Sequence, residues 1–145
     1  AVMDFSYASA ISAAGMEAER ARLDASAMNI ANVHTSRASY GGPFRPLRVV
    51  NTTTPLFSKS LSSVGQSMFS VPAPQVQQTY AAPRLVHEPG HPDANAKGFV
   101  AYPAIDTTAE MVQMMTAVRA YEANVVAMNA AKSMALKAMD IGRGS

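Results

Sequence analysis

The chain has 145 residues, a length that fits one domain with or without tails, and 48% of them are hydrophobic while only 15% are charged. Because the chain contains no cysteine, disulfide scaffolds, cysteine-ligated metal sites and thiol catalysis are excluded. Twelve basic residues against ten acidic ones leave a net charge of +2, too small and too thinly spread to indicate nucleic-acid binding, and no apolar run is long enough to span a membrane.

Proline divides the chain into three parts, because all nine prolines lie between Pro43 and Pro103. Proline lacks a backbone N–H and clashes with the preceding helical turn, so the middle cannot form a long helix. Both ends are rich in the helix formers Ala, Met and Glu. The sequence therefore predicts an N-terminal helical segment over residues 1–35, an extended or β-rich middle over residues 36–106, and a C-terminal helical segment over residues 107–145.

The N-terminal helix is predicted over residues 4–33, and two stripes of small or apolar residues run along nearly opposite sides of it. A lone amphipathic helix needs only one stripe, so two stripes predict contacts on two sides. Burial in an ordinary bundle is one explanation, but assembly with neighbouring chains is favoured because only two helices are visible in the sequence. The first stripe is Ile11, Ala14, Ala18, Ala21, Ala25 and Met28, and the second is Met16, Leu23, Ala27 and Ile30.

The middle segment carries Pro/Gly turns at residues 41–43, 71–74 and 88–92, together with clusters of Ser and Thr. This composition predicts short strands joined by loops. The Ser-rich stretch over residues 59–70 is predicted to be a flexible loop, and the path of residues 52–80 is left open.

The C-terminal helix is predicted from Thr107 to Ile141, about 35 residues or roughly 50 Å at the usual rise per residue. Thr107 as N-cap with Glu110 three residues later matches a capping box, and Gly142 offers a stop. The apolar positions repeat with the three–four spacing of a coiled-coil seam. The predicted fold is therefore mainly α with a small β or extended middle, its two long terminal helices pairing as an antiparallel coiled coil. The seam is Met111, Val118, Val125 and Met139, with Lys132 as an exception, together with Met114, Tyr121, Met128 and Ala135.

Two motifs suggest metals but lack the required context. Residues 87–91 match H-E-x-x-H, which binds zinc when both histidines lie on one face of a helix. Pro89 and Gly90 occupy the middle positions, so a structured turn is predicted instead. Residues 93–98 imitate the start of a calcium loop, but Lys97 stands where an oxygen ligand is needed. We therefore predict no catalytic residue, no metal and no cofactor, and hence no enzyme.

Two motifs, one near each end of the chain, resemble the signatures of bacterial flagellar rod, hook and hook-associated proteins. Residues 26–35, Ser-Ala-Met-Asn-Ile-Ala-Asn-Val-His-Thr, resemble the N-terminal Asn-[Leu/Ile]-Ala-Asn signature, and Ile30 stands where Leu is usual. Residues 118–124, Val-Arg-Ala-Tyr-Glu-Ala-Asn, resemble the C-terminal Arg-x-Tyr-x-x-Asn signature. Residues 40–50 and 86–106 narrow the resemblance to the short proximal rod proteins of the basal body.

The resemblance implies a structural subunit of the flagellar basal-body rod. Such a subunit would leave the cell through the flagellar type III export apparatus without a cleaved signal. It would assemble helically with copies of itself and with other rod proteins in the periplasm-spanning rod, and would carry torque from the motor to the hook. Neither nucleic-acid binding nor membrane insertion is expected. The alternative is a small secreted adaptor whose Met-rich helix forms an adaptable binding groove.

The candidate site residues are therefore assembly residues on the two terminal helices. Three asparagines are expected to tie helix ends or to make contacts between helices. For every candidate, the alternative role is packing between the two helices of one chain. The candidates are Ile11, Ala14, Ala18, Ala21, Ala25, Met28, Asn29 and Asn32 on the first helix, and Met114, Val118, Tyr121, Asn124, Val125 and Met128 on the second.

Overall fold

The computed structural model describes residues 2–52 and 73–143, with side chains over residues 8–51 and 73–143. The chain is mainly helical with small strands between the helices, as predicted, and the loop expected over residues 59–70 lies outside the described residues. The elements in chain order are α1 (Val2–Ala31), β1 (Leu47–Thr52), β2 (Ala73–Gln78), β3 (Arg84–His87), β4 (Phe99–Tyr102) and α3 (Thr107–Arg143).

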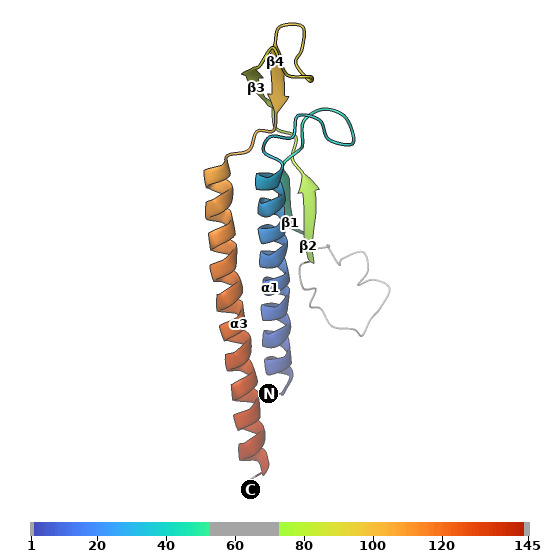
Figure 1. The fold of residues 1–145 in the computed structure, drawn as a ribbon. Coiled ribbons are helices and arrows are strands. Elements are labelled where there is room, and N and C mark those ends of the chain that lie inside the picture. The colour runs from blue at the N-terminus through green and yellow to red at the C-terminus, as the bar shows by residue number, and fades with distance from the viewer. Residues whose placement is uncertain (1, 53–72, 144–145) are drawn as a thin grey trace, which may run out of the picture.

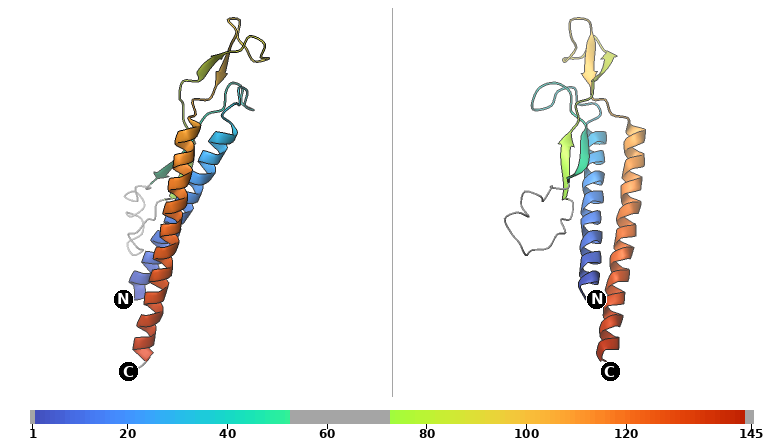
Figure 2. Two further views of the ribbon diagram at one scale, coloured as in Figure 1. Left: turned by 60° about the vertical axis from the view of Figure 1, so that its left-hand side comes forward. Right: turned by 180° about the vertical axis from the view of Figure 1, so that it is seen from behind.

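The two long helices lie side by side and run antiparallel, so that both ends of the chain lie at the same end of the molecule (Figures 1 and 2). At about 1.5 Å per residue, α1 is about 45 Å long and α3 about 55 Å. The last turns of α3 therefore extend beyond the start of α1, as Figure 1 shows. The antiparallel pairing agrees with the prediction in outline, and coiled-coil geometry stays a prediction.

In the described part of the middle segment, the strands form two small antiparallel sheets. β1 and β2 pair from Leu47↔Gln78 to Thr52↔Ala73 and lie along α1 (Figure 1). β3 and β4 form a hairpin that extends beyond the ends of the helices (Figure 2). α1 is thus contacted by α3 and also by β1 and β2. The sequence predicted that neighbouring chains would cover the side of α1 that faces away from the other helix. The chain's own strands β1 and β2 cover part of α1 instead.

The start of α3 differs from the predicted capping box. The side-chain Oδ1 of Asp106 accepts hydrogen bonds from the backbone N–H groups of Thr108 at 2.9 Å and Ala109 at 3.4 Å, so Asp106 is the N-cap rather than Thr107. Glu110 accordingly lies one position deeper in the helix and bonds to another element. Aspartate adds a full negative charge at the positive end of the helix dipole, which makes it the stronger cap here.

Candidate assembly interface

Most of the side chains that are buried on the two long helices are small. On α3, the buried residues Glu110, Ala117 and Ala131 and the half-buried Asn124 recur every seven residues. On α1, Ser12, Ala18, Ala25 and Ser26 are buried. Because most of these side chains carry only one or two heavy atoms, the two helix backbones can approach closely.

The two helices are in close contact at Gly15 of α1 and Asn124 of α3. A Cβ atom at position 15 would lie 2.9 Å from both Nδ2 and Oδ1 of Asn124 and 3.0 Å from its Cγ. The Asn124 amide is itself held in place, because its Nδ2 donates to the Ala120 carbonyl at 3.0 Å. The asparagine of the C-terminal signature thus sits in the space that the missing side chain of Gly15 leaves free.

The predicted seam on α3 is half right. Met114, Val125, Met128 and Ala135 are half-buried, as expected for seam positions. Val118 and Tyr121 are instead exposed, and Met111 and Met139 are more than half exposed. The other row of seam positions is Glu110, Ala117, Asn124 and Ala131, each one residue before the predicted position. The prediction failed there because it placed the largest apolar side chains inside, and the narrow spacing at Gly15 accepts only small ones.

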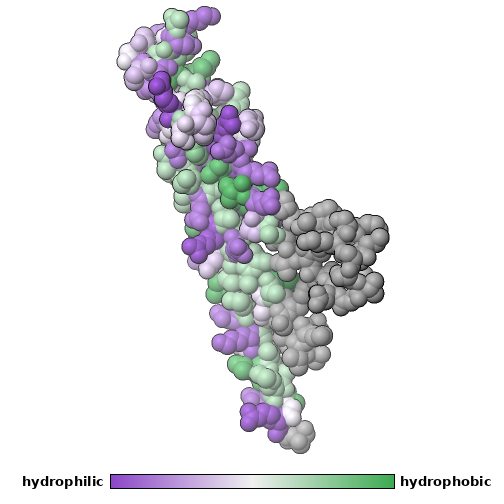
Figure 3. All heavy atoms as spheres, turned by 90° about the vertical axis from the view of Figure 1, so that its right-hand side faces the viewer, coloured by the Kyte–Doolittle hydropathy of each residue, from purple (hydrophilic) through white to green (hydrophobic). Residues whose placement is uncertain are grey.

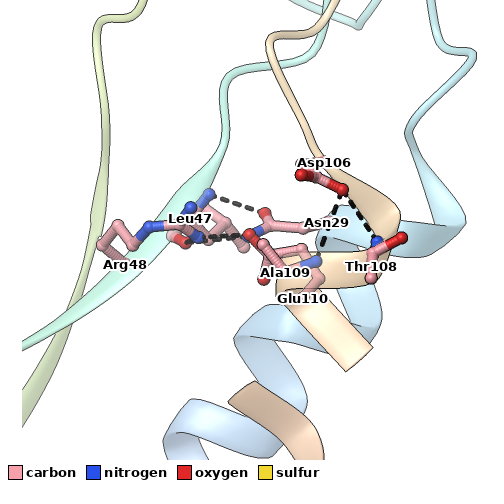
Figure 4. Close-up of polar contacts among 7 residues, drawn as sticks. All are labelled: Asn29, Leu47, Arg48, Asp106, Thr108, Ala109 and Glu110. Carbon is pink, nitrogen blue, oxygen red and sulfur yellow. Dashed lines mark hydrogen bonds and ion pairs between the residues drawn. The ribbon is translucent and has the colours of Figure 1, made fainter. Parts of the chain in front are cut away.

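Asn29 fastens the end of α1 to the start of β1. Its side chain is fully buried. The Nδ2 of Asn29 donates to the Leu47 carbonyl at 3.0 Å, while the Leu47 N–H donates to Oδ1 of Asn29 at 2.7 Å (Figure 4). The amide therefore pairs with the strand backbone as a neighbouring strand would, and both groups of each partner are satisfied. The first asparagine of the N-terminal signature thereby fixes the position of β1 on the helix.

An ion pair joins β1 to α3 beside this contact. Arg48 Nη1 lies 2.7 Å from Oε1 of Glu110 and also donates to the Leu47 carbonyl at 3.0 Å (Figure 4). Glu110 is almost fully buried, while the Arg48 side chain is partly exposed. Three elements distant in sequence therefore meet at one polar joint. The sequence predicted only a capping role for Glu110 and no role for Arg48. The position of Glu110, one residue before an apolar heptad row, was the one sign in the sequence that its side chain could face the inside of the helix pair.

The β3–β4 hairpin is organised around Tyr102. Its ring is buried, its hydroxyl donates to Oε2 of Glu88 at 3.0 Å, and the rings of His34 and His91 lie edge-on to it with centroids 6.0 and 6.2 Å away. The hydrogen bond to Glu88, together with burial and the negative charge of Glu88, raises the pKa of Tyr102 above its ordinary value of 10.0, although Arg84 opposes the shift.

The loop between these strands is a structured turn, as predicted for the Pro-Gly motif. Asp93 accepts a hydrogen bond from Ser36 at 2.8 Å and pairs with Arg37 at 2.5 Å, which ties the loop to the segment after α1. His91 Nδ1 accepts the Asp93 N–H at 3.1 Å, and the His87 ring packs against Phe99 with centroids 5.0 Å apart.

Within residues 2–52 and 73–143, no three His, Asp or Glu side chains gather in a way that could hold a metal ion. Each histidine of the H-E-x-x-H motif packs instead against an aromatic ring of β4, His87 against Phe99 and His91 against Tyr102.

The structure separates the predicted assembly residues into three groups. Ala18, Ala25 and Asn29 are covered within the chain, whereas Ile11, Met28, Val118 and Tyr121 are between 41% and 51% exposed. The third group is half-buried along the helix pair: Ala14, Ala21, Asn32, Met114, Asn124, Val125 and Met128.

Asn32 closes the end of α1, since its Nδ2 donates to the Met28 carbonyl at 2.9 Å and its Oδ1 accepts from the Thr35 hydroxyl at 3.1 Å.

Large apolar side chains lie on the outside of the helix pair. Figure 3 shows apolar residues recurring along the helical body between hydrophilic ones. On α3 alone, exposed apolar residues run from the first turn to the last: Met111, Val112, Met115, Val118, Val126, Met134, Leu136, Met139 and Ile141. In the described part of the chain, neither helix has an apolar stretch that could cross a membrane.

Comparison with known proteins gives one consistent result. The family model described as "Flagellar basal body rod FlgEFG protein C-terminal" matches residues 96–141, which include β4 and most of α3. The "Flagellar basal-body rod protein FlgC" of Bacillus subtilis is 37% identical, over 92% of this chain and 95% of that protein. The proteins of the same name from Salmonella typhimurium and Borreliella burgdorferi are 35% and 33% identical, each over 92% of this chain and 94% and 95% of their own lengths.

Proposed function

Since the chain belongs to the FlgC family of flagellar basal-body rod proteins, it is a structural subunit of the flagellar basal-body rod, and we propose that it assembles there through the outer faces of its two terminal helices. This family is a structural one and not an enzyme family.

One observation carries the proposal: the small residues of the helix pair lie inside and the large apolar residues lie outside. Ala117 and Ala131 are buried, whereas Met111, Met115 and Val126 on the same helix are more than half exposed. Exposed apolar surface on this scale marks sites that bind another protein. A helix pair that reserved its large side chains for its own core would show the opposite arrangement.

We propose that neighbouring rod subunits cover these outer faces, giving a helical assembly in which the paired helices act as an antiparallel coiled coil. The segments 1–35 and 107–145 would form the assembly unit, and the segment 36–106 would form its head. The joint of Asn29, Arg48 and Glu110 then holds head and helices in one orientation, which a rod that transmits torque from motor to hook requires.

The small side chains between the two helices also bear on how the subunit could be exported to the rod. An interface of small side chains buries little apolar area per residue, so the helix pair of an isolated subunit separates at low cost. This would suit passage through the flagellar type III export apparatus as an unfolded chain, followed by packing against copies of itself and other rod proteins in the proximal rod.

The test compares substitutions of exposed apolar residues with a matched exposed control. Val118→Ser and Met115→Ser should lower the melting temperature of the purified subunit only slightly, because Val118 is already 41% exposed and Met115 59% exposed. Both should reduce the amount of the protein found in isolated basal bodies and increase the amount in the culture medium. Ala123→Ser, on an exposed position of the same helix, should do neither. Full motility and normal rods in the Val118→Ser and Met115→Ser strains would refute the proposal.

A further inference from the structure

The head of the molecule holds an arginine between two tyrosine rings. The Cζ atom of Arg45 lies 5.0 Å from the centroid of the Tyr40 ring and 4.6 Å from that of Tyr80. Arg45 Nη1 also donates to the Tyr80 hydroxyl at 3.1 Å, and the Arg45 backbone N–H donates to the Tyr40 hydroxyl at 2.7 Å. The guanidinium is therefore held in one orientation before anything binds to it.

This arginine borders a hollow of about 390 Å³. Three segments line it: the loop before β1 with Pro43, the segment after β2 with Tyr80 and Ala82, and the linker from β4 to α3 with Pro103. Tyr80 is 81% exposed although it is one of the largest side chains in the head. The hollow thus combines a fixed cation, an exposed aromatic ring and stiff proline-rich walls.

Arg45 lacks the acidic partner that neighbouring arginines have. Arg37 pairs with Asp93 and Arg48 pairs with Glu110, whereas over residues 8–51 and 73–143 no carboxylate lies within ion-pair distance of Arg45. A fixed, planar guanidinium is suited to bind a carboxylate through two parallel hydrogen bonds. Because the Arg45 side chain is already held in one orientation, binding a carboxylate would cost it little further conformational entropy.

The chain's own charge distribution indicates where that carboxylate comes from. Residues 2–31 carry four acidic and two basic side chains, while residues 32–106 carry six basic and three acidic ones. On α1, Glu17 and Asp24 are exposed and seven residues apart, so they share one face with Arg20 between them. Neither acid makes an ion pair within the described part of the chain.

From this complementarity we propose that the Arg45 hollow of one subunit binds the acidic face of α1 of a second copy, with Glu17 or Asp24 as the carboxylate. The inference rests on the proposed assembly of the chain in the rod. It adds a contact between the head of one copy and the helix of the next, distinct from contacts among apolar helix faces. Tyr40 and Tyr80 would shield the ion pair from water, which strengthens it.

The experiment places a photoreactive p-benzoylphenylalanine at position 82 in full-length protein expressed in motile cells. Ala82 is exposed and lines the hollow but does not contribute to the Arg45 stack. Cells carry two epitope-tagged copies of the chain, so that a cross-link between copies is distinguished from one within a chain. The probe at position 82 should join residues 13–28 of a second copy. The same probe at Ala96, which is exposed on the hairpin loop away from the hollow, should not.

Three variants make the result decisive. Arg45→Gln should lower the cross-link yield by about tenfold or more, because removing one partner of a shielded charge pair costs at least that factor in affinity. Glu17→Gln combined with Asp24→Asn should lower it similarly without touching the tyrosine stack, so a folding defect of the head cannot explain the loss. Arg45→Glu combined with Glu17→Arg and Asp24→Arg should restore it.

Cross-links from position 82 to another protein, or to another part of a second copy, would overturn the inference. An unchanged yield in both the Arg45→Gln and the Glu17→Gln/Asp24→Asn variants would do the same. Immunodetection of the chain in isolated basal bodies is scored separately. If the chain is present in rods but position 82 joins elsewhere, only the head contact is wrong; if the chain is absent from rods, the proposed assembly fails as well.

Discussion

Replacing Gly15 with alanine tests whether the two helices approach as closely as the structure shows. At an ordinary helical position this substitution stabilises a protein by about 1 kcal/mol, because alanine has the higher helix propensity. At Gly15 the new methyl group would lie 2.9 Å from two atoms of Asn124. Either the helices must separate or Asn124 must move and lose its 3.0 Å hydrogen bond to the Ala120 carbonyl.

The sizes of the opposing contributions decide whether Gly15→Ala stabilises or destabilises the subunit. Overpacking of a tight contact costs about 1–3 kcal/mol, and loss of one partly buried hydrogen bond costs about 0.5–1.5 kcal/mol. Against these stands the gain of about 1 kcal/mol in propensity. We therefore expect Gly15→Ala to destabilise the subunit by about 1–2 kcal/mol, the larger figure applying if Asn124 cannot find a new bond.

The assay is urea unfolding of the purified subunit, followed by far-ultraviolet circular dichroism. Gly142 in the last turn of α3 is the matched control, because a Cβ there would meet nothing within 4 Å, and Gly142→Ala should be neutral or slightly stabilising. Asn124→Ala should relieve the clash, so the double variant should show a coupling energy of about 1 kcal/mol or more. A stabilising Gly15→Ala, with effects that simply add in the double variant, would refute the close approach.

Three further predictions concern the joint and the hairpin. Asn29→Asp keeps the shape of the side chain but turns a donor into an acceptor facing a carbonyl, so we expect a loss of about 1–3 kcal/mol in the same urea assay, while Asn29→Gln should recover little because the longer side chain does not fit. Tyr102 has a raised pKa, so its contribution to stability should be complete below pH 10 and should be lost as the pH rises through its folded-state pKa. Tyr102→Phe should remove that alkaline decline and should remove, from an absorbance titration, a tyrosine that ionises above pH 10; loss of a tyrosine that ionises at or below pH 10 would contradict the bond to Glu88. His87→Gln combined with His91→Gln should lower the melting temperature slightly and leave swimming largely intact, and a non-motile strain rescued by added zinc would show the packing role to be wrong.

Much of the fold could be predicted from composition and periodicity. The confinement of proline to residues 43–103 correctly predicted a strand-containing middle between two long helices. The pairing of those helices followed from their apolar patterns. Local patterns of this kind depend on neighbours in sequence, so one chain is enough to show them.

The details of the contact could not be predicted, because they depend on how closely two distant segments approach. A heptad of Met and Val is a sound prediction when the partner helix has room for large side chains. Here there is no room for even one added carbon atom between Gly15 and Asn124, and on the same row of α3 the small Ala117 is buried where Val118 was expected. Similarly, nothing local marks Arg48 as the partner of Glu110, since the two residues are far apart in sequence and are joined only in the folded structure, where β1 lies against α1.

The structure shows what the asparagine side chains of the two family signatures do. Asn29 of the first signature fixes β1 to the end of α1, and Asn124 of the second fills the space beside Gly15. Each asparagine uses its amide inside the subunit, where a larger apolar residue could not fit. The helix pair is therefore kept thin by polar and small side chains, and its large apolar residues remain outside. In the proposed assembly, neighbouring subunits would pack against these apolar outer faces along the length of the pair. On this proposal, the small residues that would leave the isolated subunit weakly held together are the same ones that leave its large apolar side chains outside for assembly.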